Sequence, residues 1–326
     1  MAVAPIKTRA LQLALDRDLF TRLSTPTSAA TLAGELQLSP AHAALWLELL
    51  WSMQVLSRTA ADPCEYMTSA LAERYFRTGS DHSCAQAWHY RAGFLAAIAD
   101  QLPHFVEHGR PTAPLPAASG GAGTWAQAAQ VQIGQEQRAI SVPLAMSLLE
   151  RHQVLSPGMR FLDLGGGPGW LAIELARRCN DASGVVFDLP DTVAVAASNI
   201  AACHLQQRVS VVAGDLDQDD IGEDYNLIWC SSVLHFLRDP ARAVARIQQA
   251  LRPGGSLFIV HAESSGLPEH DLRVLPFYLP MRLRGNYLPG PGQLQQLLQL
   301  AGFKHVQHEV VQGFPMAPLT LYRGIA

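Results

Sequence analysis

The residues best suited to chemistry in this chain gather in four short segments of its second half. The first, residues 161–170, reads FLDLGGGPGW, so an apolar run ends in an aspartate and a glycine-rich turn. Glycine allows the backbone to turn tightly and to approach a bound ligand closely. We therefore predict a ligand-binding turn here, with a purely structural turn as the alternative. The predicted binding residues are Asp163, Gly165, Gly167 and Gly169.

The spacing of these glycines separates two classes of ligand. A dinucleotide-binding turn of the GxGxxG type needs glycine or alanine at the position of Trp170. Because Trp170 breaks that pattern, an NAD-dependent oxidoreductase is disfavoured. The GxGxG spacing that is present, led by Asp163, suits the amino-acid tail of S-adenosylmethionine better than a pyrophosphate.

The second and third segments each place an aspartate after an apolar run. Asp188 lies 19 residues after Gly169, where a carboxylate can accept both hydroxyls of a ribose. The alternative is a structural role for Asp188, as the N-cap of a helix. Asp215 is predicted to receive an adenine amino group. The neighbouring Leu189 and Leu216 are predicted to contact the same ligand, Leu216 by packing on the adenine ring. We read the acidic stretch 217–220 as a solvated loop and predict no metal site.

The fourth segment, residues 229–240, carries Ser231, a predicted cofactor contact, and His235. An imidazole titrates near neutral pH, so His235 is a candidate general base. A lone histidine is also often a structural hydrogen-bonding residue, and position alone leaves both interpretations open.

The elements around these segments must bring them together. Short apolar runs alternate with helical stretches after residue 158, which predicts a parallel α/β sheet with helices on both faces. Ligands of such sheets bind at the carboxyl ends of the strands, where all four segments fall. The predicted strands are 160–165, 184–189, 209–215, 225–231 and 255–263, and the predicted helices are 169–179, 190–203, 239–251 and 291–301.

The first hundred residues have a different pattern. Predicted helices at 6–23, 28–36 and 41–53 precede two short strands, 54–58 and 65–68, in the order of a winged helix. The third helix has no Arg, Lys, Asn or Gln that could read base edges, so DNA binding is disfavoured. Its apolar residues Trp46, Leu50 and Met53 are predicted to face a partner surface.

Composition excludes several classes of protein. The chain has 326 residues and a net charge of −4, without the basic excess of a nucleic-acid binder. Its five cysteines form no CxxC pair, no apolar run reaches the length of a membrane span, and the N-terminus does not resemble a signal peptide. We expect a cytoplasmic protein without nucleic-acid or membrane partners.

Taken in order, these segments resemble the class I methyltransferases. The closer resemblance is to the plant and bacterial small-molecule O-methyltransferases, and it covers nearly the whole chain through LAGELQLSP, LDLGGGPG, FDLP, AGDL, VLH, LRPGG and AGF. The resemblance implies a Rossmann-like catalytic domain behind a mostly helical, winged-helix-like dimerisation domain. The implied ranges are 1–107 for dimerisation, 108–150 for a linker and cleft helix, and 151–326 for binding S-adenosylmethionine.

The resemblance also implies roles for single residues. Asp188 would bind ribose, Asp215 adenine, and His235 would be the general base supported by Glu263. Two features depart from the family: Phe236 stands where an aspartate is usual, and residues 284–289 lack the usual second glutamate. N-, S- or C-methylation driven by positioning, and a non-catalytic cofactor-binding homologue, therefore stay open beside O-methylation.

The acceptor implied by the resemblance is a small aromatic or heterocyclic secondary metabolite, as in antibiotic biosynthesis. An apolar, aromatic pocket would suit a flat molecule of this kind. The alternative is that the same side chains are ordinary core residues. The candidates are Trp125, Gln137, Met146, Phe277, Tyr278 and Met281. A symmetric homodimer through the N-terminal domain is also expected.

Overall fold

The computed structural model describes residues 2–109, 122–316 and 318–326, and it divides into two compact units, Met1–Gly93 and Phe94–Ala326. The border falls inside helix α6 (Ala85–His108), earlier than residue 107, where the sequence analysis places it. The reason is packing: Ile98 and Phe105 of α6 form an apolar cluster with Leu283, at the end of α13 (Pro268–Leu283). Most of the predicted linker, residues 110–121, lies outside the described residues.

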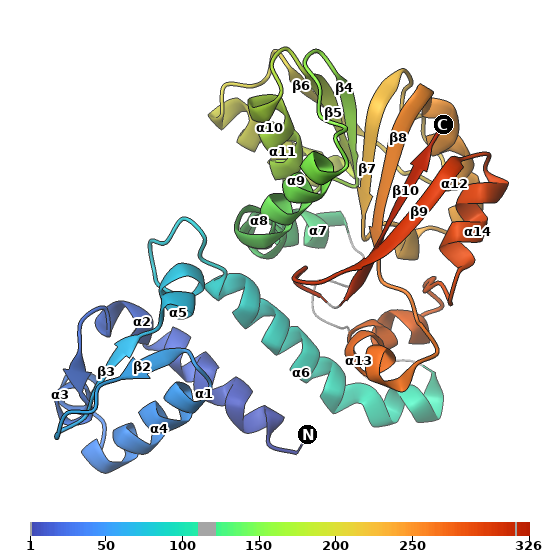
Figure 1. The fold of residues 1–326 in the computed structure, drawn as a ribbon. Coiled ribbons are helices and arrows are strands. Elements are labelled where there is room, and N and C mark those ends of the chain that lie inside the picture. Colours follow the sequence, from blue (N-terminus) through green and yellow to red (C-terminus); the bar gives the residue numbers. More distant parts are fainter. Residues whose placement is uncertain (1, 110–121, 317) are drawn as a thin grey trace. The chain divides into compact units, whose positions relative to one another are not determined.

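The first unit joins short helices to a small antiparallel sheet of order β1-β3-β2, as a winged helix does (Figure 1). The predicted helix 6–23 is divided at Asp18, whose φ of 49° is left-handed. Ser28 caps α3 by accepting a hydrogen bond from the Thr31 amide at 3.2 Å, and α4 begins at Pro40. The elements are α1 (Ala4–Asp16), α2 (Leu19–Arg22), β1 (Thr27–Ser28), α3 (Ala29–Leu36), α4 (Pro40–Ser52), β2 (Leu56–Arg58), β3 (Glu65–Thr68) and α5 (Ala70–Tyr75).

The apolar residues of α4 and its C-terminus fill this unit's own core. Leu50 is completely buried, and Met53 packs against the same cluster. Trp46 is half-buried, and its Nε1 donates a hydrogen bond to the carbonyl of Ala10 at 3.1 Å. The prediction that Trp46, Leu50 and Met53 face a partner is therefore wrong, because α1 and the small sheet cover them.

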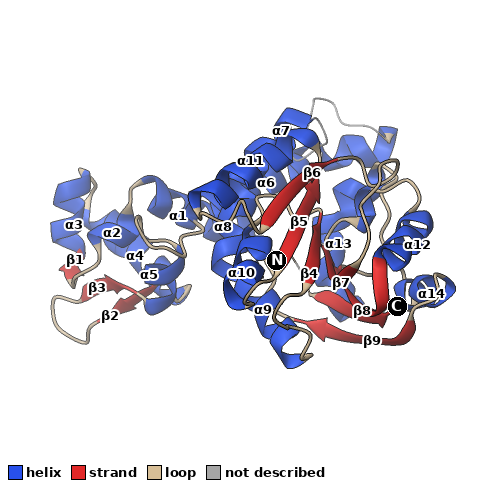
Figure 2. Ribbon diagram, turned by 90° about the horizontal axis from the view of Figure 1, so that it is seen from above, coloured by secondary structure: helices blue, strands red, loops and turns tan. Residues whose placement is uncertain are grey.

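The second unit is built on a seven-stranded sheet of order β6-β5-β4-β7-β8-β10-β9 (Figure 2). The first five strands of this order are parallel, and β10 runs antiparallel to both of its neighbours. The predicted parallel α/β sheet is confirmed for its five strands, whereas β9 and β10 were not predicted. The strands are β4 (Arg160–Leu164), β5 (Ser183–Asp188), β6 (Val209–Ala213), β7 (Tyr225–Ser231), β8 (Leu251–His261), β9 (Lys304–Val311) and β10 (Leu319–Ile325).

Two apolar cores lie on opposite faces of this sheet (Figure 2). Successive side chains of a strand point to opposite faces, so Phe161 of β4 enters one core and Leu162 the other. The helices α9 (Val142–Arg151), α10 (Trp170–Arg178) and α11 (Pro190–Ala202) cover the first core, and α12 (Pro240–Ala250) and α14 (Gln293–Leu300) cover the second.

A continuous helical run, residues 122–151, leads to the sheet. It contains α7 (Ala122–Ala128), α8 (Gly134–Glu136) and α9, joined by π-helical turns at Ala129–Ile133 and Gln137–Ser141. The cleft helix expected within 108–150 is thus present, with two wide turns in its middle. Such turns inside helices often mark functional sites. Across the described residues, no helix has both the length and the apolar character that a membrane span requires.

The order of the strands creates the place for a site. From β4 the chain continues outward through β5 and β6, and it then returns to β7 on the other side of β4. The direction of strand order therefore reverses between β4 and β7. In open α/β sheets, ligands bind at the carboxyl ends of the strands at such a switch point.

We predict that Gly184→Ala destabilises the second unit. A Cβ at Gly184, in β5, would lie 2.1 Å from Cε2 of the Phe161 ring, which is completely buried. Overpacking of this kind costs about 1–3 kcal/mol. The urea midpoint should fall, whereas the control Gly290→Ala, whose nearest contact would be an ordinary 3.5 Å, should keep it. Equal midpoints for both variants would contradict the packing described.

Candidate active site

The turn between β4 and α10 contains three alternate glycines in the left-handed region. Gly165, Gly167 and Gly169 have φ values of 67°, 59° and 77°. At Gly165 a side chain is also excluded by space, because a Cβ would lie 2.3 Å from Cγ2 of Val233. Val233 follows β7, so the glycine turn and the segment of His235 are in direct contact at the switch point.

Hydrogen bonds hold the glycine turn from two sides. The amide of Gly167 donates to Oδ2 of Asp188 at 2.8 Å. From the helical run 122–151, the Gln137 side chain donates from Nε2 to the carbonyl of Gly166 at 3.1 Å and accepts from the amide of Trp170 at 3.3 Å. Gln137, predicted in the acceptor pocket, instead uses both ends of its amide on the glycine turn.

Asp163 is a buried carboxylate whose hydrogen bonding is incomplete. It is 3% exposed, and its Oδ2 has no hydrogen-bond partner among the described residues. Burial, with a smaller contribution from the nearby charge of Asp188, raises the pKa of Asp163 to about 7. Buried polar atoms in folded proteins almost always have partners, so this acceptor indicates a missing donor or cation.

Asp188 lies near Asp163, and neither carboxylate forms an ion pair with a described residue. Burial raises the pKa of Asp188, against the lowering effect of hydrogen bonds from the amides of Gly167 and Leu189. Each carboxylate oxygen keeps a second lone pair for another donor. Two neighbouring carboxylates beside a glycine turn, Asp163 buried and Asp188 half-buried, fit a ligand that carries both a positive charge and hydroxyl groups.

The remaining predicted cofactor residues lie around this centre. Asp215 follows β6 and accepts hydrogen bonds from the Asp217 amide at 2.9 Å and the Gln218 side chain at 2.8 Å. Leu189 and Ser231 are half-buried at the ends of β5 and β7. Leu216 is buried in the second core, so the predicted packing on an adenine ring is wrong: its side chain points into the protein.

His235 lies on a single 3₁₀ turn, Leu234–Phe236, directly after β7. It is 3% exposed, and its Nδ1 lies 3.2 Å from Nε2 of His261, the last residue of β8. Burial and the neighbouring His261 hold the pKa of His235 well below its ordinary value. The ring of Phe236 lies 4.0 Å from that of His235, and the ring of Tyr278 lies 5.6 Å away.

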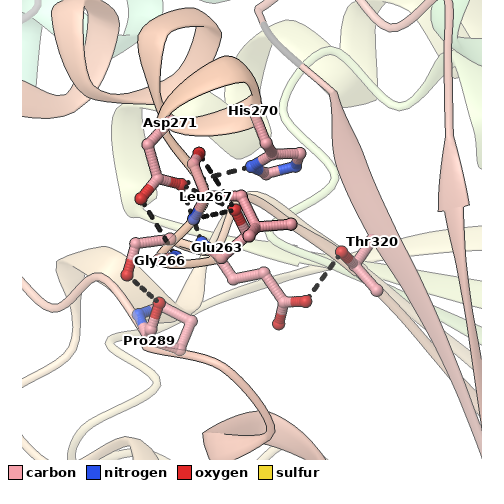
Figure 3. Close-up of polar contacts among 9 residues, drawn as sticks. Glu263, Gly266, Leu267, His270, Asp271, Pro289 and Thr320 are labelled. Carbon is pink, nitrogen blue, oxygen red and sulfur yellow. Dashed lines mark hydrogen bonds and ion pairs between the residues drawn. The ribbon is translucent and has the colours of Figure 1, made fainter.

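Glu263 does not support His235 as predicted. Its Oε1 accepts from Thr320 at 3.0 Å, as Figure 3 shows, and its Oε2 accepts from the hydroxyl of Tyr322 at 2.7 Å. Both partners come from β10, the antiparallel strand that was not predicted. The position beside His235 belongs to His261, which the sequence analysis missed. Its signal was a titratable residue within the otherwise apolar run SLFIVHA.

The predicted acceptor residues divide into two groups. Trp125 lies near His235, because its ring is 4.9 Å from that of Phe236, and Phe277 extends this aromatic group through Tyr278 at 5.5 Å. The others pack with the first core: Met146 and Tyr278 are buried in it, and Met281 lies partly buried against it. For Met146, the interpretation as an ordinary core residue is the better one.

A hollow lies at the opposite end of the parallel strands. Its volume is about 690 Å³, and its lining includes Arg160, Asp224 and Arg252, near the amino ends of β4, β7 and β8. Ligands of open α/β sheets bind at the carboxyl ends. The candidate site is therefore the one that contains Asp163, Asp188 and His235.

Comparison with solved structures confirms the fold class. The chain superposes on human N-acetylserotonin methyltransferase, solved in complex with S-adenosylmethionine, with a TM-score of 0.75 at 20% identity. The superposition covers 99% of this chain and 95% of that one. At this level of identity, the likeness shows the fold alone.

Curated relatives and a family model give the sequence comparison. The chain is 34% identical to acetylserotonin O-methyltransferase of Rattus norvegicus over 44% of this chain and 34% of that enzyme. It is 26% identical to 3-amino-4-hydroxybenzoate 4-O-methyltransferase of Streptomyces cremeus over 78% and 70%. The matches span about a third to a half of the first curated relatives.

Residues 135–308, more than half of the chain, match the family model described as a methyltransferase domain, and the chain belongs to that family.

Proposed function

We propose that this protein is an S-adenosylmethionine-dependent O-methyltransferase acting on a small aromatic secondary metabolite. The observation that carries the proposal is the buried, incompletely bonded carboxylate of Asp163 beside the glycine turn, at the sheet edge that also holds His235. The names of relatives support the acceptor class, because acetylserotonin, 3-amino-4-hydroxybenzoate and 3-hydroxy-5-methyl-1-naphthoate are aromatic compounds.

The residues present fit the cofactor. The glycine turn allows its amino-acid tail to approach the backbone, and Asp163 and Asp188 supply the negative charge that a cation requires. We assign the ribose hydroxyls to Asp188 and the adenine amino group to Asp215. When bound, the cofactor would supply an activated methyl group on a sulfonium sulfur.

His235 acts on the acceptor as general base. It is neutral near pH 7, because its pKa is lowered, so it has a lone pair for the hydroxyl proton. The aromatic residues Trp125 and Phe236 lie close enough to hold a flat ring beside it. Positioning of the acceptor against an already activated methyl group supplies much of the remaining acceleration.

The first unit is proposed to form a symmetric homodimer. Leu45 on α4 is 68% exposed, and Leu13 on α1 is 40% exposed. Apolar side chains on neighbouring helices suit a self-complementary contact. We expect a dimer in sedimentation at micromolar concentration, and Leu45→Glu should shift it toward monomer. Leu300→Glu is the control, because Leu300 at the end of α14 is 78% exposed and belongs to the second unit. A wild-type monomer under these conditions would contradict the proposal.

We predict that Asp163→Asn stabilises the ligand-free protein and weakens cofactor binding. The folded-state pKa of about 7 exceeds the ordinary 3.8, so ionisation costs stability as the pH rises from 4 to 7. The cost at pH 8 is roughly 4 kcal/mol, which an amide avoids. Urea unfolding at pH 8 should show the variant more stable, while calorimetry should show S-adenosylmethionine binding about tenfold or more weaker.

The matched control for Asp163 is Asp181→Asn, at an exposed position with φ of 55°, a conformation that asparagine tolerates. It should change neither quantity. In thermal shift, S-adenosylmethionine should stabilise the wild type and NAD should not. If Asp163→Asn neither gains stability at pH 8 nor loses cofactor affinity, Asp163 does not bind the cofactor.

His235→Ala should lower turnover by about 10²–10⁴, the usual contribution of a general base. Cofactor affinity should stay nearly unchanged, because His235 acts on the acceptor. The assay is transfer of a labelled methyl group to a panel of aromatic hydroxyl and amine acceptors, with exposed His305→Ala as control. Unchanged turnover would make His235 structural, methylation of amines alone would favour N-methylation, and no transfer would indicate a non-catalytic homologue.

A further inference from the structure

A chain of two hydrogen-bond contacts runs from the carbonyl of Ala262 through His261 to His235, and it determines which nitrogens of the two buried histidines carry hydrogen. Nδ1 of His261 lies 2.5 Å from the carbonyl oxygen of Ala262. A carbonyl oxygen can only accept a hydrogen bond, so Nδ1 of His261 must carry the hydrogen. Burial lowers the pKa of His261 to about 4, which makes its ring neutral near pH 7. Its other nitrogen, Nε2, therefore has a lone pair and no hydrogen.

The hydrogen bond between the two histidines then fixes the position of the proton on His235. Its Nδ1 lies 3.2 Å from Nε2 of His261, and that nitrogen can only accept. Nδ1 of His235 must therefore be the donor. Since His235 is itself neutral, its Nε2 is left without a hydrogen, as a general base requires.

We propose that His261 is the positioning residue of His235: it fixes the His235 tautomer with a bare Nε2, and it does so as a neutral partner in place of a carboxylate. The role as base rests on the proposed function, whereas the tautomer is a property of the folded chain. The orientation passes from the Ala262 carbonyl to the His235 ring through two hydrogen bonds, since the bond at one ring nitrogen sets the state of the other.

The groups that face His235 support a neutral partner. His261 faces it from β8, and the ring of Tyr278 faces it from α13. The side chain of Asn286 donates to the carbonyl of His235 at 2.9 Å. Glu263 is the nearest carboxylate in sequence to His261, and its two oxygens accept hydrogen bonds from Thr320 and Tyr322.

This arrangement selects the acceptor by acidity. Once His235 has taken a proton from the acceptor hydroxyl, no carboxylate in the pair stabilises the imidazolium. The pair is therefore a weaker base than a histidine beside a carboxylate. It suits a hydroxyl that gives up its proton readily, such as a phenol with an electron-withdrawing substituent.

Nitrogen NMR of the whole protein with ¹⁵N-labelled histidine tests the tautomer directly. The His235 signals are assigned by their loss in His235→Gln. We expect a protonated Nδ1 and a bare Nε2 at pH 7 in the wild type, with the same pattern in His261. A hydrogen on Nε2 of His235 would overturn the proposal, and this reading needs neither an acceptor nor any variant of His261.

Three variants of His261 separate positioning from packing. His261→Gln and His261→Glu have nearly the same shape and both offer an oxygen near the place of Nε2, but only the second brings a charge. The Gln variant should keep the tautomer, and the Glu variant should raise the His235 midpoint in NMR titration by about one pH unit or more. His261→Leu removes the acceptor and should lower kcat about tenfold or more, with the KM for S-adenosylmethionine nearly unchanged. Equal midpoints for Gln and Glu would overturn the neutral-partner role.

Catechol and 4-nitrocatechol, which are similar in size, probe the acceptor. The wild type should favour the more acidic 4-nitrocatechol in kcat/KM, and this preference should fall in His261→Glu but persist in His261→Gln. An unchanged preference in the Glu variant would contradict selection by acidity. Transfer to no hydroxyl acceptor, or full activity of His235→Ala, would count against the proposed function and leave the tautomer to the NMR result.

Discussion

Two carboxylates, buried Asp163 and half-buried Asp188, have no counter-charge among the described residues, and the second unit is organised around this constraint. Asp163 and Asp188 lie near the carboxyl ends of the adjacent parallel strands β4 and β5, and the Gly167 amide ties Asp188 to the glycine turn by a hydrogen bond. Removing a carboxylate from water is costly unless donors or a cation replace the lost solvation. The chain supplies part of that replacement through backbone amides, and Oδ2 of Asp163 is left for a ligand.

The glycine turn is held beside these carboxylates by side chains that approach it closely. The side chain of Val233 occupies the space where a Gly165 side chain would lie, and Gln137 binds the turn through two hydrogen bonds. These contacts join three separate parts of the chain at one edge of the sheet. The segment after β7 is thereby brought to the glycine turn, and His235 lies two residues beyond Val233. The binding of the cofactor and the position of the base thus depend on the same close approach.

Features set by local pattern could be predicted from the sequence. The five parallel strands, the glycine turn and the segment of His235 each follow from a short run of residues, and the family comparison confirmed the class to which they point. The predictions that failed concern the direction of single side chains. Leu216 and Met146 face the core, and nothing in their own segments distinguishes that from facing a ligand.

The prediction that Glu263 supports His235 was wrong for a similar reason. The direction of this side chain is set by residues far away in the sequence. Glu263 and His261 are two residues apart, and their roles are decided by β10, which binds Glu263 through Thr320 and Tyr322. Because β10 pairs antiparallel with β8 from the far end of the chain, its register cannot be inferred from residues near position 261.

The two ends of the proposed site differ in their electrostatics, and the difference agrees with the chemistry. The end with Asp163 and Asp188 is anionic, so it favours a positively charged methyl donor. The end with His235 is neutral and flanked by the rings of Phe236 and Tyr278, so it favours an uncharged aromatic acceptor. During transfer, positive charge leaves the first end and a proton reaches the second. The neutral partner His261 thus orients the base without adding a negative charge at the acceptor end.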